Sequence, residues 1–131
     1  MHFAIHLKTA KFDVLSEDKN PVNPIYGQSL LKWLKRNLNE RIKFYEIEAE
    51  DWGWYCHVEF NNMKYMLGSS TFFEEGDNPK SELDWVFQVE KIRSIKEKLL
   101  LKNKMTINDE CLLFFKSYLE NEKDIKVLSI E

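Results

Sequence analysis

The chain has 131 residues, of which 44% are hydrophobic, 14% aromatic and 31% charged. This length and composition are typical of one globular domain that buries its own core, and they exclude a disordered or low-complexity chain. The formal net charge of −3 excludes a global positive field that would attract nucleic acid or an anionic membrane, but it does not exclude local basic patches.

The N-terminal residues 2–7 alternate apolar and polar side chains, a pattern that predicts a half-buried first strand. Such a run is too short to span a bilayer or to form the apolar core of a secretion signal. We therefore expect a cytoplasmic protein with no membrane partner. Cys56 and Cys111 have neither the spacing of metal ligands nor a disulfide framework, so we interpret them as buried free thiols.

Residues 8–24 are polar and contain several breakers of regular structure, which predicts a long surface loop. Leucines at helical spacing then predict a first helix over residues 27–39 that covers the sheet. Residues 42–48 have a short and less regular apolar pattern, which favours a strand that leads into a hairpin.

Residues 52–71 predict a β-hairpin whose register can be derived from its turn. Asn61 and Asn62 suit a two-residue turn, since Asn tolerates the positive φ that such turns require. One side of the hairpin is then almost wholly apolar, and on the other side the ring of Tyr55 can cover the bare backbone of Gly68. The pairs expected in this register are Phe60 with Met63, Glu59 with Lys64, Val58 with Tyr65, Cys56 with Leu67, Tyr55 with Gly68, and Trp54 with Ser69.

Four more elements follow the hairpin. Alternation predicts a strand over residues 83–89, and a helical period then favours a short helix near residues 93–102. Thr106, which is followed by acidic residues, predicts the N-cap of a final helix whose apolar stripe includes Ile107. Residues 125–130 indicate a last short strand.

The order of these elements predicts one α+β domain over residues 1–131. We expect a mainly antiparallel sheet of about five strands with about three helices packed on one of its faces. The expected core consists of residues in the apolar phases of these elements: Phe3, Ile5, Leu30, Leu34, Trp54, Val58, Leu67, Trp85, Phe87, Phe115 and Leu119.

Three histidines, His2, His6 and His57, lie on predicted strands and on the polar side of the sheet. Three imidazoles can bind zinc or a similar metal ion. Residues four apart on a strand lie about 13 Å apart, so His2 and His6 cannot ligate the same ion. The pattern favours half-exposed strand histidines, and we assign no metal ion or other cofactor.

Four acidic residues lie just before the hairpin: Glu46, Glu48, Glu50 and Asp51. Paired carboxylates can act as general acid and base or hold Mg²⁺ when their environments separate their pKa values. The sequence shows no such environment, and it contains no catalytic triad order, Walker loop or dinucleotide-binding glycine motif. The pattern therefore favours a solvated strand end or a binding surface over an active site.

The densest basic segment is 91–104, which contains Lys91, Arg93, Lys96, Lys98, Lys102 and Lys104. Basic residues interleaved with aromatic ones are typical of nucleic-acid binding. Aromatic residues are missing from this segment, and Glu90 and Glu97 dilute its charge. The segment therefore favours a solvated helix over a weak nucleic-acid binder.

Two tracts carry a resemblance to known proteins: residues 50–55, with the sequence EDWGWY, and residues 26–31, with the sequence YGQSLL. In these tracts the chain resembles small uncharacterised bacterial proteins. The resemblance implies a bacterial cytoplasmic protein, but it implies no activity and no functional residue.

The open end of the hairpin is the predicted contact site. If Trp52 faces Thr71, aromatic rings and carboxylates gather in one surface, which suits recognition of a basic protein. The predicted site consists of Glu50, Asp51, Trp52, Phe72, Phe73, Glu74 and Glu75. The favoured hypothesis is a non-catalytic protein-binding module of the immunity or regulatory type. The alternatives are a small enzyme or metal-dependent catalyst that uses the histidines or residues 46–51, and a weak nucleic-acid binder that uses residues 91–104.

Overall fold

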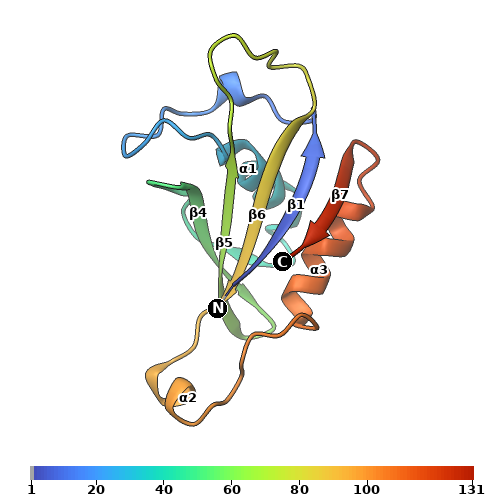
Figure 1. Cartoon of the computed structure of the whole chain (residues 1–131). Coiled ribbons are helices and arrows are strands. Elements are labelled where there is room, and N and C mark those ends of the chain that lie inside the picture. Colours follow the sequence, from blue (N-terminus) through green and yellow to red (C-terminus); the bar gives the residue numbers. More distant parts are fainter. Residues whose placement is uncertain (1) are drawn as a thin grey trace.

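A single antiparallel sheet organises the chain in the computed structural model, which describes residues 2–131 (Figure 1). The strand order is β2, β4, β5, β6, β1 and β7, and β3 pairs with β4 on the same outer edge as β2. The strands are β1 (His2–Thr9), β2 (Lys43–Phe44), β3 (Glu48–Glu50), β4 (Gly53–Phe60), β5 (Met63–Thr71), β6 (Leu83–Lys91) and β7 (Ile125–Ile130). The helices are α1 (Gln28–Leu38), α2 (Ile95–Leu99), α3 (Glu110–Glu120) and the short 3-10 helix η1 (Val14–Ser16).

The α+β class is as the sequence predicts, although the sheet has seven strands within the described residues instead of about five. Part of the difference comes from the segment 42–48, which was expected to form one strand. This segment contains the whole of β2 and the first residue of β3, two short edge strands that pair with different parts of β4.

The hairpin of β4 and β5 has the register that the sequence predicts. Asn61 and Asn62 form its turn with φ values of 48° and 63°, in the left-handed region that Asn tolerates. Gly68 pairs with Tyr55, but the ring that covers it belongs to Trp52, because a Cβ at Gly68 would lie 2.6 Å from Cη2 of that indole. A side chain at Gly68 would therefore displace Trp52 from the sheet.

Two helices, α1 and α3, cover one face of the sheet (Figure 1). They contact each other through Trp33 and Tyr118, whose ring centroids lie 5.5 Å apart. The remaining α-helix, α2, lies beyond the end of the sheet, and none of its residues is buried. Two of the three helices thus form the layer that covers the sheet.

The core lies between the sheet and this helix layer. Ten of the eleven expected core residues are buried, and Phe3 is partly buried at the edge of the core. Phe87 of β6 packs against Phe115 of α3 with ring centroids 5.6 Å apart, which joins the centre of the sheet to the helices. The alternation along the strands therefore confirms the apolar phase derived from the sequence.

The long loop after β1 folds back on α1 and supplies its cap. The carboxylate of Glu17 accepts hydrogen bonds from the backbone N–H groups of Gly27, Gln28 and Ser29 at 2.8, 3.0 and 2.9 Å. Gly27 occupies the N-cap position, and a Cβ there would lie 2.2 Å from the carbonyl oxygen of Ser69. Because no side chain fits at the N-cap, the helix can approach β5 only with a cap from another segment.

The final helix begins later than the sequence predicts. Asp109, not Thr106, is the N-cap, since its carboxylate accepts hydrogen bonds from the backbone N–H groups of Cys111 and Leu112 at 2.9 and 3.2 Å. The same carboxylate binds two side chains of the sheet, and this contact between distant segments fixes where the helix starts. Ile107 therefore precedes the helix and is 47% exposed instead of belonging to its apolar stripe.

Candidate functional site

The second face of the sheet, which we call the open face, has no helix over it within residues 2–131 (Figure 1). Its residues alternate along each strand with those that point into the core. Four paired residues cross the middle of this face, from β1 to β4: Ala4, Gln88, Gly68 and Tyr55. Gly68 has no side chain, and the ring of Trp52 packs over its backbone on this face.

One side of the open face carries four rings, which we call the aromatic row: Trp52, Tyr55, His57 and Tyr45. Ring centroids lie 6.5 Å apart for Trp52 and Tyr55, and 5.8 Å apart for Tyr55 and His57. The backbone N–H of Tyr45 donates to the carbonyl oxygen of His57 at 2.9 Å, which places Tyr45 next along the row. The aromatic row thus follows β4 on the face that the helices leave bare.

Carboxylates lie at the hydroxyl ends of the aromatic row. The hydroxyl of Tyr55 donates to Glu48 at 3.1 Å, and the hydroxyl of Tyr45 donates to Glu59 at 3.1 Å. The hydrogen bond to Glu48 favours the neutral phenol and is the main reason that the pKa of Tyr55 is raised above its ordinary value. The row therefore has an acidic margin at Glu48, whereas at its Tyr45 end the carboxylate of Glu59 is paired with Lys43 at 3.9 Å.

The predicted contact site is only partly assembled, because Trp52 does not pair with Thr71. The backbone N–H of Thr71 donates instead to the carbonyl oxygen of Tyr26 at 2.8 Å. The side-chain amide of Asn20 donates to the two carbonyl oxygens that flank the β3–β4 turn, at 3.0 and 2.9 Å, and so fixes the loop at this point. The loop lies between the acidic turn and the end of β5.

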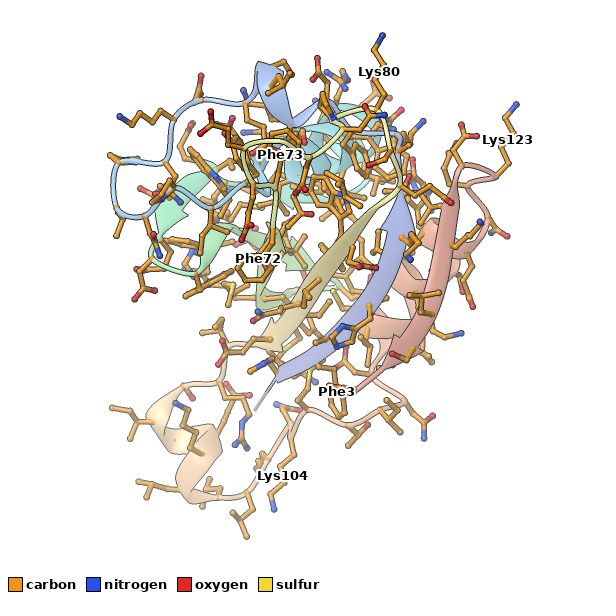
Figure 2. The ribbon with its side chains drawn as sticks, turned by 45° about the horizontal axis from the view of Figure 1, so that its top comes forward. Phe3, Phe72, Phe73, Lys80, Lys104 and Lys123 are labelled. Carbon is orange, nitrogen blue, oxygen red and sulfur yellow. The ribbon has the colours of Figure 1, made fainter. Side chains whose placement is uncertain are left out.

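The residues of the predicted site consequently form two groups. Glu50 and Asp51 lead into Trp52, whose ring lies on the open face. Phe72, Phe73, Glu74 and Glu75 follow β5 in the loop toward β6 (Figure 2).

Within the second group, the two phenylalanines differ. Phe72 is 73% exposed, whereas Phe73 packs edge-on against Tyr26 with ring centroids 5.8 Å apart. Glu74 and Glu75 are exposed. Sequence reasoning missed the separation of the two groups because it depends on Asn20, and the asparagine- and proline-rich tract at 20–24 was the available signal.

The three histidines lie on the open face but not together. His57 is on β4, and β5 and β6 separate it from His2 and His6 on β1. Three strand spacings amount to about 14 Å, which is too far for ligands of one ion. Across residues 2–131, no group of three or more histidine, cysteine or acidic side chains is placed to hold a metal ion.

Of the acidic residues 46–51, Glu48 and Glu50 lie on the edge strand β3, whereas Glu46 precedes it and Asp51 lies in the turn that follows it. Glu48 binds the hydroxyl of Tyr55, and a carboxylate oxygen of Glu50 accepts a hydrogen bond from the backbone N–H of Asp51 at 2.9 Å. These contacts are with a phenol and an amide, so they do not form an acid/base pair of carboxylates.

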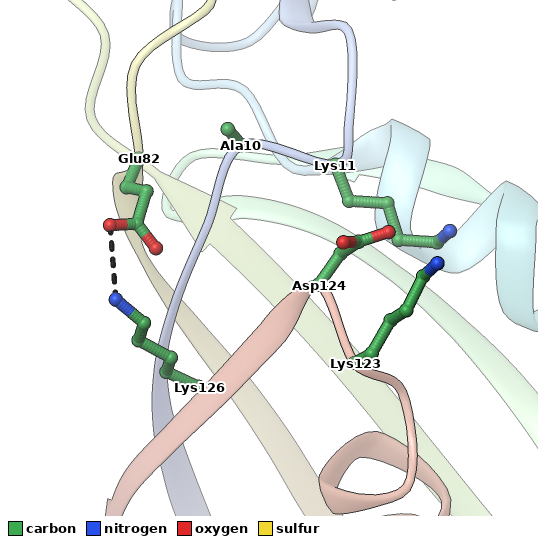
Figure 3. Close-up of a pocket in the computed structure, with 6 residues that line it drawn as sticks. All are labelled: Ala10, Lys11, Glu82, Lys123, Asp124 and Lys126. Atoms are coloured by element: carbon green, nitrogen blue, oxygen red, sulfur yellow. Dashed lines mark hydrogen bonds and ion pairs between the residues drawn. The ribbon is translucent and has the colours of Figure 1, made fainter.

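A hollow of about 390 Å³ lies between the end of β1 and the start of β7 (Figure 3). Its six lining residues are Ala10, Lys11, Glu82, Lys123, Asp124 and Lys126. Lys126 pairs with Glu82 at 3.3 Å, and Lys11 pairs with Glu122 at 3.5 Å. Because most of its charges neutralise each other, this hollow is a weaker candidate than the open face.

Comparison with known proteins finds no matching family model, no matching curated sequence and no matching solved structure. In the part of the chain that the structure describes, no helix combines the length and the apolar character needed to cross a bilayer.

Proposed function

We propose that this protein is a non-catalytic protein-binding module of the bacterial cytoplasm, of the immunity or regulatory type. The observation that carries the proposal is the aromatic row on an uncovered sheet face with carboxylates at its margin. Aromatic residues supply much of the binding energy at protein interfaces, and carboxylates beside them favour a basic partner.

The size of the open face is consistent with this proposal. The four long strands β4, β5, β6 and β1 make a face about 20 Å wide and about 27 Å long. Its projected area of roughly 500 Å² is a large part of the roughly 800 Å² that each partner buries in a standard interface. The exposed ring of Phe72 follows β5 and would extend the contact beyond this face.

The cytoplasmic location is part of the proposal. It is supported by Cys56 and Cys111, which are both free and buried, since reducing compartments keep thiols in this form. The alternative of a small enzyme has less support, because the histidines are separated and the carboxylates of Glu48 and Glu50 bind a phenol and an amide.

The proposal is tested with tagged protein that captures its partner from a bacterial lysate, followed by calorimetry with the purified partner. We expect Trp52→Ala with Tyr55→Ala to weaken binding by at least about tenfold with the variant still folded, because truncating interface aromatics costs about 2 kcal/mol or more. An unchanged affinity would refute the assignment to the open face.

A second pair of variants tests the charge of the partner. Glu48→Gln with Glu50→Gln should slow association and reduce its salt dependence, since carboxylates at an interface margin steer a basic partner. The matched control is Glu40→Gln with Glu120→Gln, which removes the same charge at the ends of the covering helices. If both double variants changed the association rate and its salt dependence equally, the carboxylates beside the aromatic row would have no specific role in binding.

A further inference from the structure

Residues 92–107, which we call the α2 excursion, leave the sheet after β6 and return at α3 (Figure 1). Four aliphatic side chains of this segment face solvent: Ile95 is 78% exposed, Leu99 78%, Leu100 52% and Leu101 67%. The fold gains nothing from their burial, and α2 has no buried residue. Exposed aliphatic side chains gathered in one short segment mark a contact surface.

The α2 excursion is nevertheless held in shape by its own polar contacts. Ser94 and Glu97 form a reciprocal capping box at the start of α2. Asn103 donates to the carboxylate of Glu97 at 2.6 Å, and Arg93 donates to the carbonyl oxygen of Lys102 at 3.0 Å. These bonds fix a backbone from which the aliphatic side chains project outward.

Positive charge is concentrated in residues 91–104, which overlap the α2 excursion. Residues 91–104 contain six basic side chains and one acidic one, a net charge of +5, so the rest of a chain with net charge −3 carries −8. Lys91 is paired with Asp109 at 3.3 Å, but within residues 2–131 no carboxylate pairs with the side chains of Lys96, Lys98, Lys102 or Lys104. Lys104 lies in the α2 excursion, away from the sheet (Figure 2).

This composition does not suit a protein or nucleic-acid partner. Hot spots of protein interfaces are rich in Trp, Tyr and Arg, whereas lysine is depleted there. The α2 excursion has no aromatic residue, and its one arginine, Arg93, already binds a backbone oxygen. Nucleic-acid sites place stacking aromatics beside their charges, and leucines add nothing to a contact with phosphates.

A second copy of the chain is also a poor occupant. The loop between β5 and β6, which contains Glu74 and Glu75, lies at the opposite end of the molecule from the α2 excursion (Figure 1). If the α2 excursion of one molecule bound the other end of a second molecule, the interface would be heterologous. Such an interface builds open filaments unless its geometry closes a ring, so a simple dimer would not form.

We propose that the α2 excursion docks this protein reversibly on an anionic lipid surface. The aliphatic side chains enter the headgroup region, and the unpaired lysines contact lipid phosphates and carboxylates. The hollow beside Arg93 and Lys98 has a volume of only about 100 Å³ and includes Glu90, so surface charge and not a headgroup pocket provides the attraction. The expectation of no membrane partner rested on the short N-terminal apolar run and on the net charge, and neither of these reports this local concentration of basic and aliphatic side chains.

The docking surface is independent of the open face, and its test uses the full chain with vesicles alone. We expect the protein to cosediment with phosphatidylcholine vesicles that contain about 30% phosphatidylserine at about 0.1 M salt, and to dissociate at about 0.5 M salt. Equal cosedimentation with pure phosphatidylcholine, or none with either vesicle, would overturn the proposal.

The lysine variant tests the charge. Each lysine near an anionic surface contributes about fivefold in affinity, so Lys96→Gln, Lys98→Gln and Lys102→Gln together should reduce binding about 100-fold. The control removes the same charge at exposed sites elsewhere: Lys19→Gln, Lys80→Gln and Lys123→Gln. Equal losses in both variants would overturn the proposal.

The leucine variant separates a lipid surface from other anions. Leu99→Ser with Leu100→Ser should reduce vesicle binding about tenfold and leave the melting temperature unchanged, because neither side chain is buried. The control is Leu128→Ser, which changes an exposed leucine on β7. Two results would overturn the lipid proposal. If the protein shifted duplex DNA in a gel, and this shift depended on the lysines and not on the leucines, the α2 excursion would be a nucleic-acid site. If the protein self-associated and the leucine variant did not, the α2 excursion would be an interface between two copies of the chain.

Discussion

At Asp109 a single carboxylate joins β5, β6 and α3. The hydroxyl of Tyr65 donates to Oδ2 at 2.9 Å, and Nζ of Lys91 lies 3.3 Å from the same oxygen. The other oxygen caps α3. Burial, and then the hydrogen bond to Asp109, raises the pKa of Tyr65 far above its ordinary value. The four donors satisfy a charge that would otherwise be costly to bury.

We predict that Asp109→Ala destabilises the fold by about 3 to 5 kcal/mol, because it leaves the Lys91 charge without its partner and α3 without its cap. Urea denaturation measures the loss. Adding Lys91→Met should recover part of it, since that change removes the orphaned charge. Lys116→Met breaks only the exposed pair with Glu120 and should cost less than about 0.5 kcal/mol. A cost below about 1 kcal/mol for Asp109→Ala would contradict this account.

At the scale of elements, α1 depends on a cap that its own sequence cannot provide. Gly27 has no side chain, and the space beside it is filled by the carbonyl oxygen of Ser69. Glu17 lies in the preceding loop and binds the first backbone N–H groups of the helix. The loop is therefore part of the helix layer and not a free connection.

We predict that Glu17→Ala destabilises the protein by about 1 to 2 kcal/mol, the usual cost of losing an N-cap. Hydrogen exchange should show the loss first at the amides of Gln28 and Ser29, which bind the carboxylate. Glu40→Ala, an exposed change just beyond the other end of α1, serves as the control. Unchanged protection of these amides in Glu17→Ala would show that the cap is not needed.

The elements that the sequence predicts are those whose signals are local. Asn61 and Asn62 are adjacent, and together with alternation they determine the whole register of β4 and β5. The contacts that sequence reasoning missed, by Asn20, Glu17 and Asp109, join segments whose proximity exists only after folding. The same limit explains the error in the candidate site. The predicted pairing of Trp52 with Thr71 is wrong because the loop that Asn20 holds lies between them, and no local signal places that loop there.

At the scale of the whole molecule, the buried ionisable groups make stability depend on pH. Burial raises the pKa of the Cys56 thiol from 9.0 to about 12. Burial, and then the nearby charge of Asp109, also raises the pKa of Cys111 above its ordinary value. A folded pKa above the unfolded one means that the contribution to stability is complete below pH 9. It is lost as the pH rises, because only the unfolded chain releases the proton.

We predict that the free energy of unfolding falls between pH 9 and pH 12, by about 1 to 2 kcal/mol at pH 10 for Cys56 alone. Urea denaturation from pH 7 to pH 10 measures this decrease. Cys56→Ala with Cys111→Ala should be less stable at neutral pH, because it opens small cavities in the core, but it should lose less stability on going to pH 10. The decisive quantity is therefore the change with pH and not the stability at one pH. If both proteins lost the same free energy between pH 8 and pH 10, ionisation of the buried thiols could not be the cause of the alkaline decrease.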